Sequence, residues 1–201
     1  MDQKDNNEIT VKVTSSKEEL IQILEKKGFL PGNSFSLDDY YFVPNDLDLK
    51  KMTTRDILSK AVIIRNIFEN NVYIKKITYK IKEFNSNGEI LNQKAINCNI
   101  DDIEQAKQLL TAIGYKQIMN IKEKDIVYYK EQLALAIKDI KNGDILIEVE
   151  TEPNSEFDTI DKLKNVIKNL DIPIEPNQYF IKKAEIEFDK IRENISSTNH
   201  Q

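Results

Sequence analysis

Short stretches in which polar residues alternate with β-branched or aromatic residues recur along this chain and predict a protein rich in β-strands. The predicted strands are Ile9–Val13, Tyr40–Val43, Ala61–Phe68, Tyr73–Phe84, Glu89–Ile100, Met119–Tyr129, Gln132–Ile140 and Ile145–Thr151. Clusters typical of tight turns lie between several of them, at Asn70-Asn71, Asn85–Gly88 and Asn142–Asp144. Six or more antiparallel strands joined in this way favour a barrel or a strongly curved sheet.

Apolar residues spaced three or four positions apart predict two helices within the first 115 residues. Ser16 followed by Glu19 forms a capping box that begins the first helix, and Gly28 suits the left-handed position that ends it. The second helix begins at the cap signature of Asp101 and ends at Gly114. The fold class predicted from these elements is therefore α+β.

Two further helices are predicted near the end of the chain, roughly at 158–170 and 178–195, with Pro173 and Pro176 between them. Residues 1–7 are polar and are expected to be flexible, as is the tail at 196–201. We expect a single domain over residues 8–195, because 201 residues is an ordinary length for one domain.

Several predicted strands carry polar residues on one face and apolar residues on the other, because residues i and i+2 share a face. The polar faces include Glu8, Thr10 and Lys12; Lys76, Thr78 and Lys80; and Glu148 and Glu150. An open sheet with one solvated face would explain this pattern. A barrel with its polar faces turned inward and its helices packed outside would also explain it.

Arg65 is the most informative polar residue within a predicted strand, because the rest of that strand, Ala61–Phe68, is mostly apolar. Arginine is rarely buried without a partner. Arg65 either reaches to a nearby edge of the sheet or faces a polar interior that holds an anion.

The composition is that of a soluble globular protein, with 40% hydrophobic and 31% charged residues. The single cysteine, Cys98, excludes an internal disulfide framework. No apolar run approaches the roughly 18 residues of a membrane-spanning helix, and residues 1–8 lack the apolar stretch of a secretory signal. We therefore expect a cytoplasmic protein without a membrane partner.

Several other kinds of chemistry are excluded or disfavoured. The net charge of −5 argues against a nucleic-acid partner. His200 is the only histidine and lies in the tail, so no Ser-His-Asp or Cys-His arrangement is available, and the five glycines form no phosphate-binding loop. Cys98 is expected as a packed core thiol, and Asp38-Asp39 as solvated or capping acids.

The order of several short motifs resembles the CYTH superfamily over roughly residues 8–190. Within that superfamily it is most similar to class IV adenylyl cyclases, the relatives of thiamine triphosphatase and inorganic triphosphatase. The motifs are Glu8-x-Thr10-x-Lys12, Gly28-Phe29, Asp39-x-Tyr41-Phe42, Val62-Ile63-Ile64-Arg65, Ile77-Thr78-Tyr79-Lys80, Gly114-Tyr115-Lys116, Lys122-x-Lys124 and Glu148-Val149-Glu150.

The resemblance implies a closed or nearly closed eight-stranded antiparallel β-tunnel with helices on the outside. By position it implies phosphate ligands at Lys12, Arg65, Lys80, Lys122 and Lys124, with Lys76 as a further cation on the face of Lys80. It implies metal ligands for Mg²⁺ or Mn²⁺ at Glu8, Asp139, Glu148 and Glu150. Lys12, Arg65 and Glu148 are the residues that we expect to carry catalysis.

The sequence departs from the family pattern mainly in its acidic residues. Thr10 replaces the second acid of the first strand, and the middle strand has neutral residues at Ala95, Asn97 and Asn99. Direct alignment places Lys138 where the family has an aspartate, and only a shift of one residue recovers Asp139. The phosphate-binding set is thus largely kept while the metal-binding set is thinned, which should weaken divalent-cation binding.

Four functions stay open, and the simplest of them is an α+β interaction protein with a solvated open sheet that binds no nucleotide. The chain could be a metal-dependent enzyme that cyclises ATP to cyclic AMP and pyrophosphate, or one that hydrolyses a triphosphate. It could instead be a degenerate binding module that keeps affinity for nucleotides or polyphosphate without turnover. We expect a small-molecule triphosphate as the partner. The oligomeric state is left open, a homodimer included.

Overall fold

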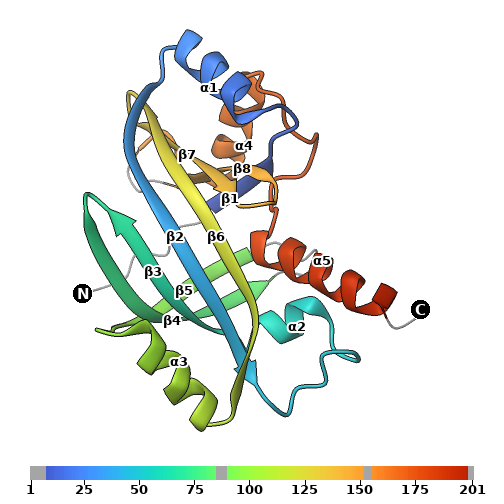
Figure 1. Cartoon of the computed structure of the whole chain (residues 1–201). Helices are drawn as coiled ribbons and strands as arrows, with labels where there is room; N and C mark the ends of the chain where they lie inside the picture. Colours follow the sequence, from blue (N-terminus) through green and yellow to red (C-terminus); the bar gives the residue numbers. More distant parts are fainter. Residues whose placement is uncertain (1–7, 85–89, 152–154, 199–201) are drawn as a thin grey trace. The chain divides into compact units, whose positions relative to one another are not determined.

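A computed structural model of the chain describes residues 8–84, 90–151 and 155–198 (Figure 1). Over these residues the strands are β1 (Glu8–Lys12), β2 (Leu30–Pro44), β3 (Val62–Glu69), β4 (Val72–Phe84), β5 (Ile90–Asn99), β6 (Tyr115–Lys130), β7 (Leu133–Ile140) and β8 (Ile145–Glu150). The helices are α1 (Lys17–Lys26), α2 (Thr54–Leu58), α3 (Ile103–Ala112), α4 (Ile160–Asn169) and α5 (Lys183–Thr198). The predicted flexible segment 1–7, the predicted turn at Asn85–Gly88 and His200 lie outside the described residues.

The described strands form one eight-stranded sheet in the order β1-β8-β7-β6-β2-β3-β4-β5. The β1–β8, β7–β8, β6–β7 and β3–β4 pairs are all antiparallel. The predicted α+β class and the predicted antiparallel sheet are therefore confirmed. The tight turn predicted at Asn70-Asn71 joins β3 to β4, and both residues adopt the positive φ that a two-residue hairpin loop needs.

The predicted closure of the sheet into a tunnel is not found, since β1 and β5 are the two ends of the strand order among the described residues. The outer edge of β1 has another partner. The Thr10 amide donates to the carbonyl of Tyr179 at 2.9 Å, and the Ile181 amide donates to the carbonyl of Thr10 at 3.0 Å. Because this later segment uses the backbone groups of β1, the edge is not available to β5.

The chain divides into two compact units, each assembled from three separate stretches of sequence. The first unit comprises residues 1–36, 82–93 and 123–181, and the second comprises 37–81, 94–122 and 182–201. The prediction of a single domain over residues 8–195 stays a prediction, and the two units are described separately below.

In the first unit, helices α1 and α4 cover the apolar face of β1, β7 and β8 (Figure 1). The buried residues of this core include Ile9, Val11, Leu20, Leu24, Leu135, Ile137, Ile147, Val149, Leu163 and Ile167. The Ser16 hydroxyl accepts from the Glu19 amide, as the capping box predicts, and Gly28 after the helix has φ +85°. The alternation along each strand leaves the opposite face of this part of the sheet to polar residues.

In the second unit, α3 packs on β2 and β3, where Phe42 and Ile64 meet Ala106 and Leu110. The short helix α2 was not predicted, and it contacts α5 through an ion pair of 3.2 Å between Arg55 and Glu185. The unit thus has a helix-covered apolar face like that of the first unit. The other face of β3 and β4 carries Arg65, Lys76 and Lys80.

Three local predictions need correction. The cap of α3 is Asp102 and not Asp101, since the Asp102 side chain accepts from the Gln105 amide. Helix α5 begins at Lys183 and not Gln178, because residues 179–181 lie extended along β1. Cys98 is exposed and not a packed core thiol, because β5 is an end strand of the sheet.

Candidate functional site

The second unit places two cations directly opposite each other on neighbouring strands. Arg65 on β3 and Lys76 on β4 are partners in the antiparallel register, so their side chains leave the sheet on the same face. Lys80 shares that face, because it follows Lys76 by four positions on the same strand. Three of the predicted phosphate ligands therefore lie together.

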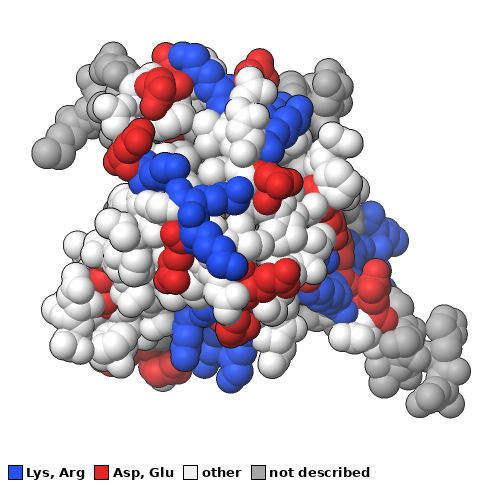
Figure 2. Space-filling view, turned by 90° about the horizontal axis from the view of Figure 1, so that it is seen from above, with Lys and Arg blue, Asp and Glu red and all other residues white. Residues whose placement is uncertain are grey.

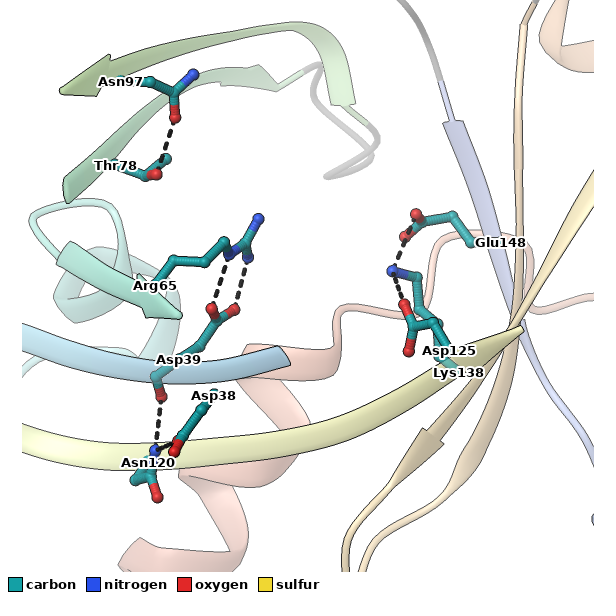
Figure 3. A network of polar contacts seen from close by, with 9 residues as sticks. All are labelled: Asp38, Asp39, Arg65, Thr78, Asn97, Asn120, Asp125, Lys138 and Glu148. Atoms are coloured by element: carbon teal, nitrogen blue, oxygen red, sulfur yellow. Dashed lines mark hydrogen bonds and ion pairs between the residues drawn. The ribbon is translucent and has the colours of Figure 1, made fainter. Parts of the chain in front are cut away.

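Arg65 forms a two-pronged ion pair with a buried carboxylate, Asp39 of β2 (Figure 3). Its Nε donates to Asp39 Oδ1 at 2.7 Å and its second guanidinium nitrogen donates to Oδ2 at 2.5 Å. The Asp39 side chain is 1% exposed, whereas that of Arg65 is 17% exposed. The pair positions the guanidinium with part of its surface open to solvent, which suits a group that also contacts a ligand.

The pKa of Asp39 shows how many cations surround it. Burial by itself raises the pKa of this carboxyl, but the hydrogen bonds and charge of Arg65, together with the charges of Lys183 and Lys80, outweigh burial and hold the pKa below its usual value. Lys183 is the first residue of α5 and was not among the predicted site residues. Three cations thus act on one buried carboxylate.

Lys76 has the opposite environment, since no hydrogen bond or ion pair joins its ammonium to any residue in the described part of the chain. Burial and the charge of Arg65 together lower the pKa of Lys76, with only a weaker opposing influence from Asp39. Like charges directly opposite each other on adjacent strands destabilise a sheet. A cation held there against repulsion is the feature expected of a site for a polyanion.

Between Lys76 and Lys80, the face of the sheet that carries Arg65 is neutral. The Thr78 hydroxyl, which is buried, donates to Asn97 Oδ1 on β5 at 2.8 Å. Asn97 is one of the neutral residues that stand in place of the family's acids. Because its amide oxygen accepts this hydrogen bond, it does not add a charge that would repel an anion bound by Lys76 and Lys80.

The stability of the protein should depend on pH through Asp39. A carboxyl whose pKa is lower in the folded state than the roughly 3.9 of the unfolded chain stabilises the fold above that value and loses this contribution as the pH falls through the folded pKa. We expect the free energy of unfolding, measured with urea between about pH 3 and 7, to fall steeply below about pH 4. Asp39→Asn should be flatter in this range; equal slopes in both proteins would contradict the assignment.

The first unit gathers carboxylates on the polar face of β1 and β8. The register pairs Glu8 with Glu150 and Thr10 with Glu148 across these strands. Carboxylate oxygens of Glu8, Glu148 and Glu150 lie within 4.8 Å of one another. Three of the four predicted metal ligands are therefore brought together, and each comes from a strand whose other face is buried under α1 and α4.

The fourth predicted metal ligand, Asp139, lies on the opposite face. Its Oδ2 accepts from the Lys17 ammonium of α1 at 2.8 Å. The neighbouring residue Lys138 faces the acids instead, 3.1 Å from Glu148 Oε1 and 3.4 Å from Asp125 Oδ2 (Figure 3). The structure thus follows the direct alignment, with a lysine where the family has an aspartate.

The two lysines predicted on β6 are also turned away from this polar face. Lys124 pairs in register with Asp139, so both side chains project from the face of Lys17 and not from that of Lys138. Glu123 and Asp125, which alternate with the lysines, are buried on the polar face. Both faces of β6 carry charged residues, so the alternation of side chains along the strand could not by itself predict which of them lie on the polar face of the sheet.

Lys122 and Lys12 are held in ion pairs of their own. The Lys122 ammonium lies 3.3 Å from Asp38 Oδ2, which also accepts from the Tyr40 hydroxyl at 2.9 Å. Burial, followed by this hydrogen bond, raises the pKa of Tyr40 to about 12. The Lys12 ammonium lies 3.1 Å from Asp144 and 3.4 Å from Glu175.

Asp39, dismissed from the sequence as a solvated or capping acid, is in fact buried against Arg65. A signal was present, because Asp39 shares its face of the strand with Leu37, Tyr41 and Val43, which are buried. Lys183 offered no comparable signal, since its place near Asp39 depends on how α5 follows the extended segment before it.

On the face drawn in Figure 2, basic and acidic side chains are interspersed and no broad region of one sign stands out. Within the part of the chain that the structure describes, no helix is both long and apolar enough to cross a membrane.

Comparison with known proteins adds independent support for the fold. No family model matches the chain. A protein of Methanocaldococcus jannaschii, "Putative adenylate cyclase MJ0240", is 24% identical over 168 residues, which are 82% of this chain and 89% of that protein.

Two solved structures show the same fold. The PH1819 protein of Pyrococcus horikoshii aligns with a TM-score of 0.68 at 18% identity, over 92% of this chain and 99% of its own. "Putative adenylyl cyclase HpAC1" from Hippeastrum, whose structure is described as revealing a dominant triphosphatase activity, aligns with a TM-score of 0.56 at 16% identity, over 90% of this chain and 93% of its own. The likeness indicated by the motifs is thereby confirmed at the level of the fold: this chain has the fold of these solved structures, one of which is named a putative adenylyl cyclase.

Proposed function

We propose that this protein binds a triphosphate, most simply ATP or inorganic tripolyphosphate, and acts on it with Mg²⁺ or Mn²⁺. The observation that carries the proposal is the pair formed by Arg65 and Lys76 on adjacent strands, of which Lys76 forms no ion pair among the described residues. A polyphosphate would offset the repulsion between these two cations by placing negative charge beside both.

The residues of the second unit would bind phosphate oxygens in different ways. Arg65 is already oriented by Asp39, so little side-chain entropy is lost when its exposed guanidinium edge donates to a phosphate. Lys76 and Lys80 would each donate from a mobile ammonium. Lys183 is a further candidate, because its charge acts on Asp39 in the same cluster.

The carboxylates of the first unit fit a hard divalent cation. Mg²⁺ and Mn²⁺ prefer oxygen ligands, and two oxygens bound to one Mg²⁺ lie at most about 4.2 Å apart. The oxygens of Glu8, Glu148 and Glu150 lie within 4.8 Å of one another, so a bound ion would draw these side chains only slightly closer together. A bound ion would supply Lewis-acid polarisation and charge neutralisation for phosphoryl chemistry. The part of this chain would be to hold that ion on one face of β1 and β8 while Lys138 neutralises part of the remaining acid charge.

Two reactions are compatible with these groups. In cyclisation, the ribose 3′-oxygen attacks the α-phosphorus, the bond to the β-phosphate oxygen breaks, and pyrophosphate leaves. In hydrolysis, water attacks the γ-phosphorus, the bond from that phosphorus to the oxygen bridging to the β-phosphate breaks, and inorganic phosphate, the diphosphate product and a proton are released. The Methanocaldococcus jannaschii relative is named a putative adenylate cyclase, which supports the first reaction, and the Hippeastrum structure is described as revealing a dominant triphosphatase activity, which supports the second. In either case the catalytic contribution of the chain would be positioning and charge stabilisation.

A non-catalytic nucleotide- or polyphosphate-binding module is the second candidate. The observation that favours it is the presence of neutral or basic residues at Thr10, Asn97 and Lys138, where the family carries acids. Fewer carboxylates give weaker affinity for divalent ions. Such a protein would bind the triphosphate through Arg65 and Lys76 and release no product.

Product analysis separates these functions. The protein is incubated with Mn²⁺ and either ATP or tripolyphosphate, and cyclic AMP, pyrophosphate and phosphate are measured. An enzyme forms one of these products, and Glu150→Gln should reduce its rate by roughly tenfold or more because a metal carboxylate is lost. Lys141→Gln, in the exposed turn after β7, should leave the rate unchanged. Binding without any product would support the non-catalytic module, and no binding at all would contradict both proposals.

A further inference from the structure

Lys138 lies in the middle of the carboxylate face of the first unit and contacts acids on both sides. Its ammonium is 3.4 Å from Asp125 Oδ2 on β6 and 3.1 Å from Glu148 Oε1 on β8. The Lys138 side chain is 13% exposed, and that of Asp125 is fully buried. The lysine therefore bridges the two strands on either side of its own, much as a bound cation would.

Several further acids lie on the same face as Lys138. Glu123 and Asp125 come from β6, and the group of Glu8, Glu148 and Glu150 comes from β1 and β8. Glu123 and Asp125 are almost fully buried, so solvent screens their mutual repulsion poorly. Burial lowers the pKa of Lys138, but the charges of Glu148, Asp125 and Glu123 more than reverse this and keep the side chain protonated.

Glu148 connects this arrangement to the metal group. Glu148 forms an ion pair with the Lys138 ammonium, and it is also one of the three carboxylates whose oxygens lie within 4.8 Å of one another. In two-metal sites of phosphoryl-transfer enzymes the ions lie about 3.5–4 Å apart, close enough to share such a carboxylate. Here the ammonium of Lys138, a cation that belongs to the chain itself, lies beside the Glu148 carboxylate.

We propose that Lys138 replaces a second divalent ion, so that the carboxylate face takes one divalent cation, at Glu8, Glu148 and Glu150. This inference rests on the proposed function, because it presupposes that the three acids bind a metal. It identifies Lys138 as a positioning residue that determines the metal stoichiometry. Removing its charge would take away the cation that lies between Asp125 and Glu148, and a second ion could bind in its place.

Manganese titration of the full chain tests the proposal. After removal of metal with a chelator, Mn²⁺ binding is measured by calorimetry and by the electron paramagnetic resonance signal of free Mn²⁺. We expect one bound Mn²⁺ in the unaltered protein and two in Lys138→Gln. Lys138→Arg, which keeps the cation, and Lys141→Gln, a control on the exposed turn after β7, should each bind one.

The double variant Asp125→Asn with Lys138→Gln removes one acid together with the lysine, so it should return to a single Mn²⁺. Should Lys138→Gln fail to fold in metal-free buffer, its folding is followed by far-ultraviolet circular dichroism as Mn²⁺ is added. Folding restored by millimolar Mn²⁺ supports the proposal, whereas a variant that stays unfolded in Mn²⁺ overturns it.

Three binding results would contradict the proposal or its basis. Two Mn²⁺ ions in the unaltered protein, or one in Lys138→Gln with unchanged affinity, would overturn the role of Lys138 and leave the metal site standing. No Mn²⁺ binding by the unaltered protein, with or without tripolyphosphate, would overturn the metal requirement of the proposed function and this inference with it.

Discussion

Arg65→Ala is expected to lower the free energy of unfolding by about 3–5 kcal/mol, the usual cost of breaking a buried ion pair from one side. The reason is the Asp39 carboxylate, which is 1% exposed and would lose both hydrogen bonds from the guanidinium. Urea unfolding at neutral pH measures this loss. The same variant should bind tripolyphosphate at least roughly tenfold more weakly, because a charge-assisted hydrogen bond contributes about 1.5–3 kcal/mol.

Arg55→Ala provides a matched control in the same unit. Arg55 also pairs with a carboxylate, Glu185, but its side chain is 40% exposed. Exposed pairs contribute about 0–1 kcal/mol, so this variant should unfold almost like the unaltered protein. If Arg55→Ala and Arg65→Ala were equally stable, the importance assigned to the buried pair would be wrong.

Stability and binding can be separated by replacing both members of the buried pair. Asp39→Asn combined with Arg65→Gln leaves no unpaired buried charge, so much of the lost stability should return. Tripolyphosphate affinity should stay low, because the guanidinium is still missing. Recovery of affinity together with stability would show that Arg65 supports the fold without binding phosphate.

Lys76→Met is expected to change stability and binding in opposite directions. In the absence of ligand, removing a cation that faces Arg65 relieves repulsion, so the free energy of unfolding should rise slightly, by less than about 1 kcal/mol since the side chain is partly exposed. Affinity for tripolyphosphate should fall by roughly ten- to a hundredfold, because one charge-assisted hydrogen bond is lost. Thermal unfolding without ligand and calorimetric titration with tripolyphosphate measure the two effects.

Lys75→Met is the control for this prediction. Lys75 precedes Lys76 on β4 and projects from the opposite face, where its ammonium donates to the carbonyl of Asp101 at 2.9 Å. It should leave tripolyphosphate affinity unchanged. Equal loss of affinity in both variants would indicate a general effect of lysine charge and not a defined site.

The features that could be predicted from the sequence are those determined by neighbouring residues. The Ser16 cap, the glycine after α1 and the hairpin at Asn70-Asn71 depend on a few adjacent positions, and the structure has all of them. The polar and apolar faces of β1, β4 and β8 also follow, because strand side chains alternate. Arg65 could be singled out because it breaks an apolar run.

The features that could not be predicted depend on residues distant in sequence. The sheet was expected to close, but residues 179–181 occupy the edge of β1, and no local pattern indicates that pairing. Asp39 and Arg65 are 26 positions apart, so the acid was taken for a solvated one. On β6, charged residues lie on both faces, and the burial of Glu123 and Asp125 leaves Lys122 and Lys124 on the opposite side.

The most direct test of triphosphate binding by the second unit is thermal unfolding of the protein with and without tripolyphosphate. Ligand at about 100 times its dissociation constant should stabilise the fold by roughly 2.7 kcal/mol, a rise of several degrees in Tm for a chain of this size. The rise should be present in the unaltered protein and in Lys75→Met and much smaller in Lys76→Met at the same concentration. An unchanged Tm in the unaltered protein, or an equal rise in all three, would contradict the proposed site.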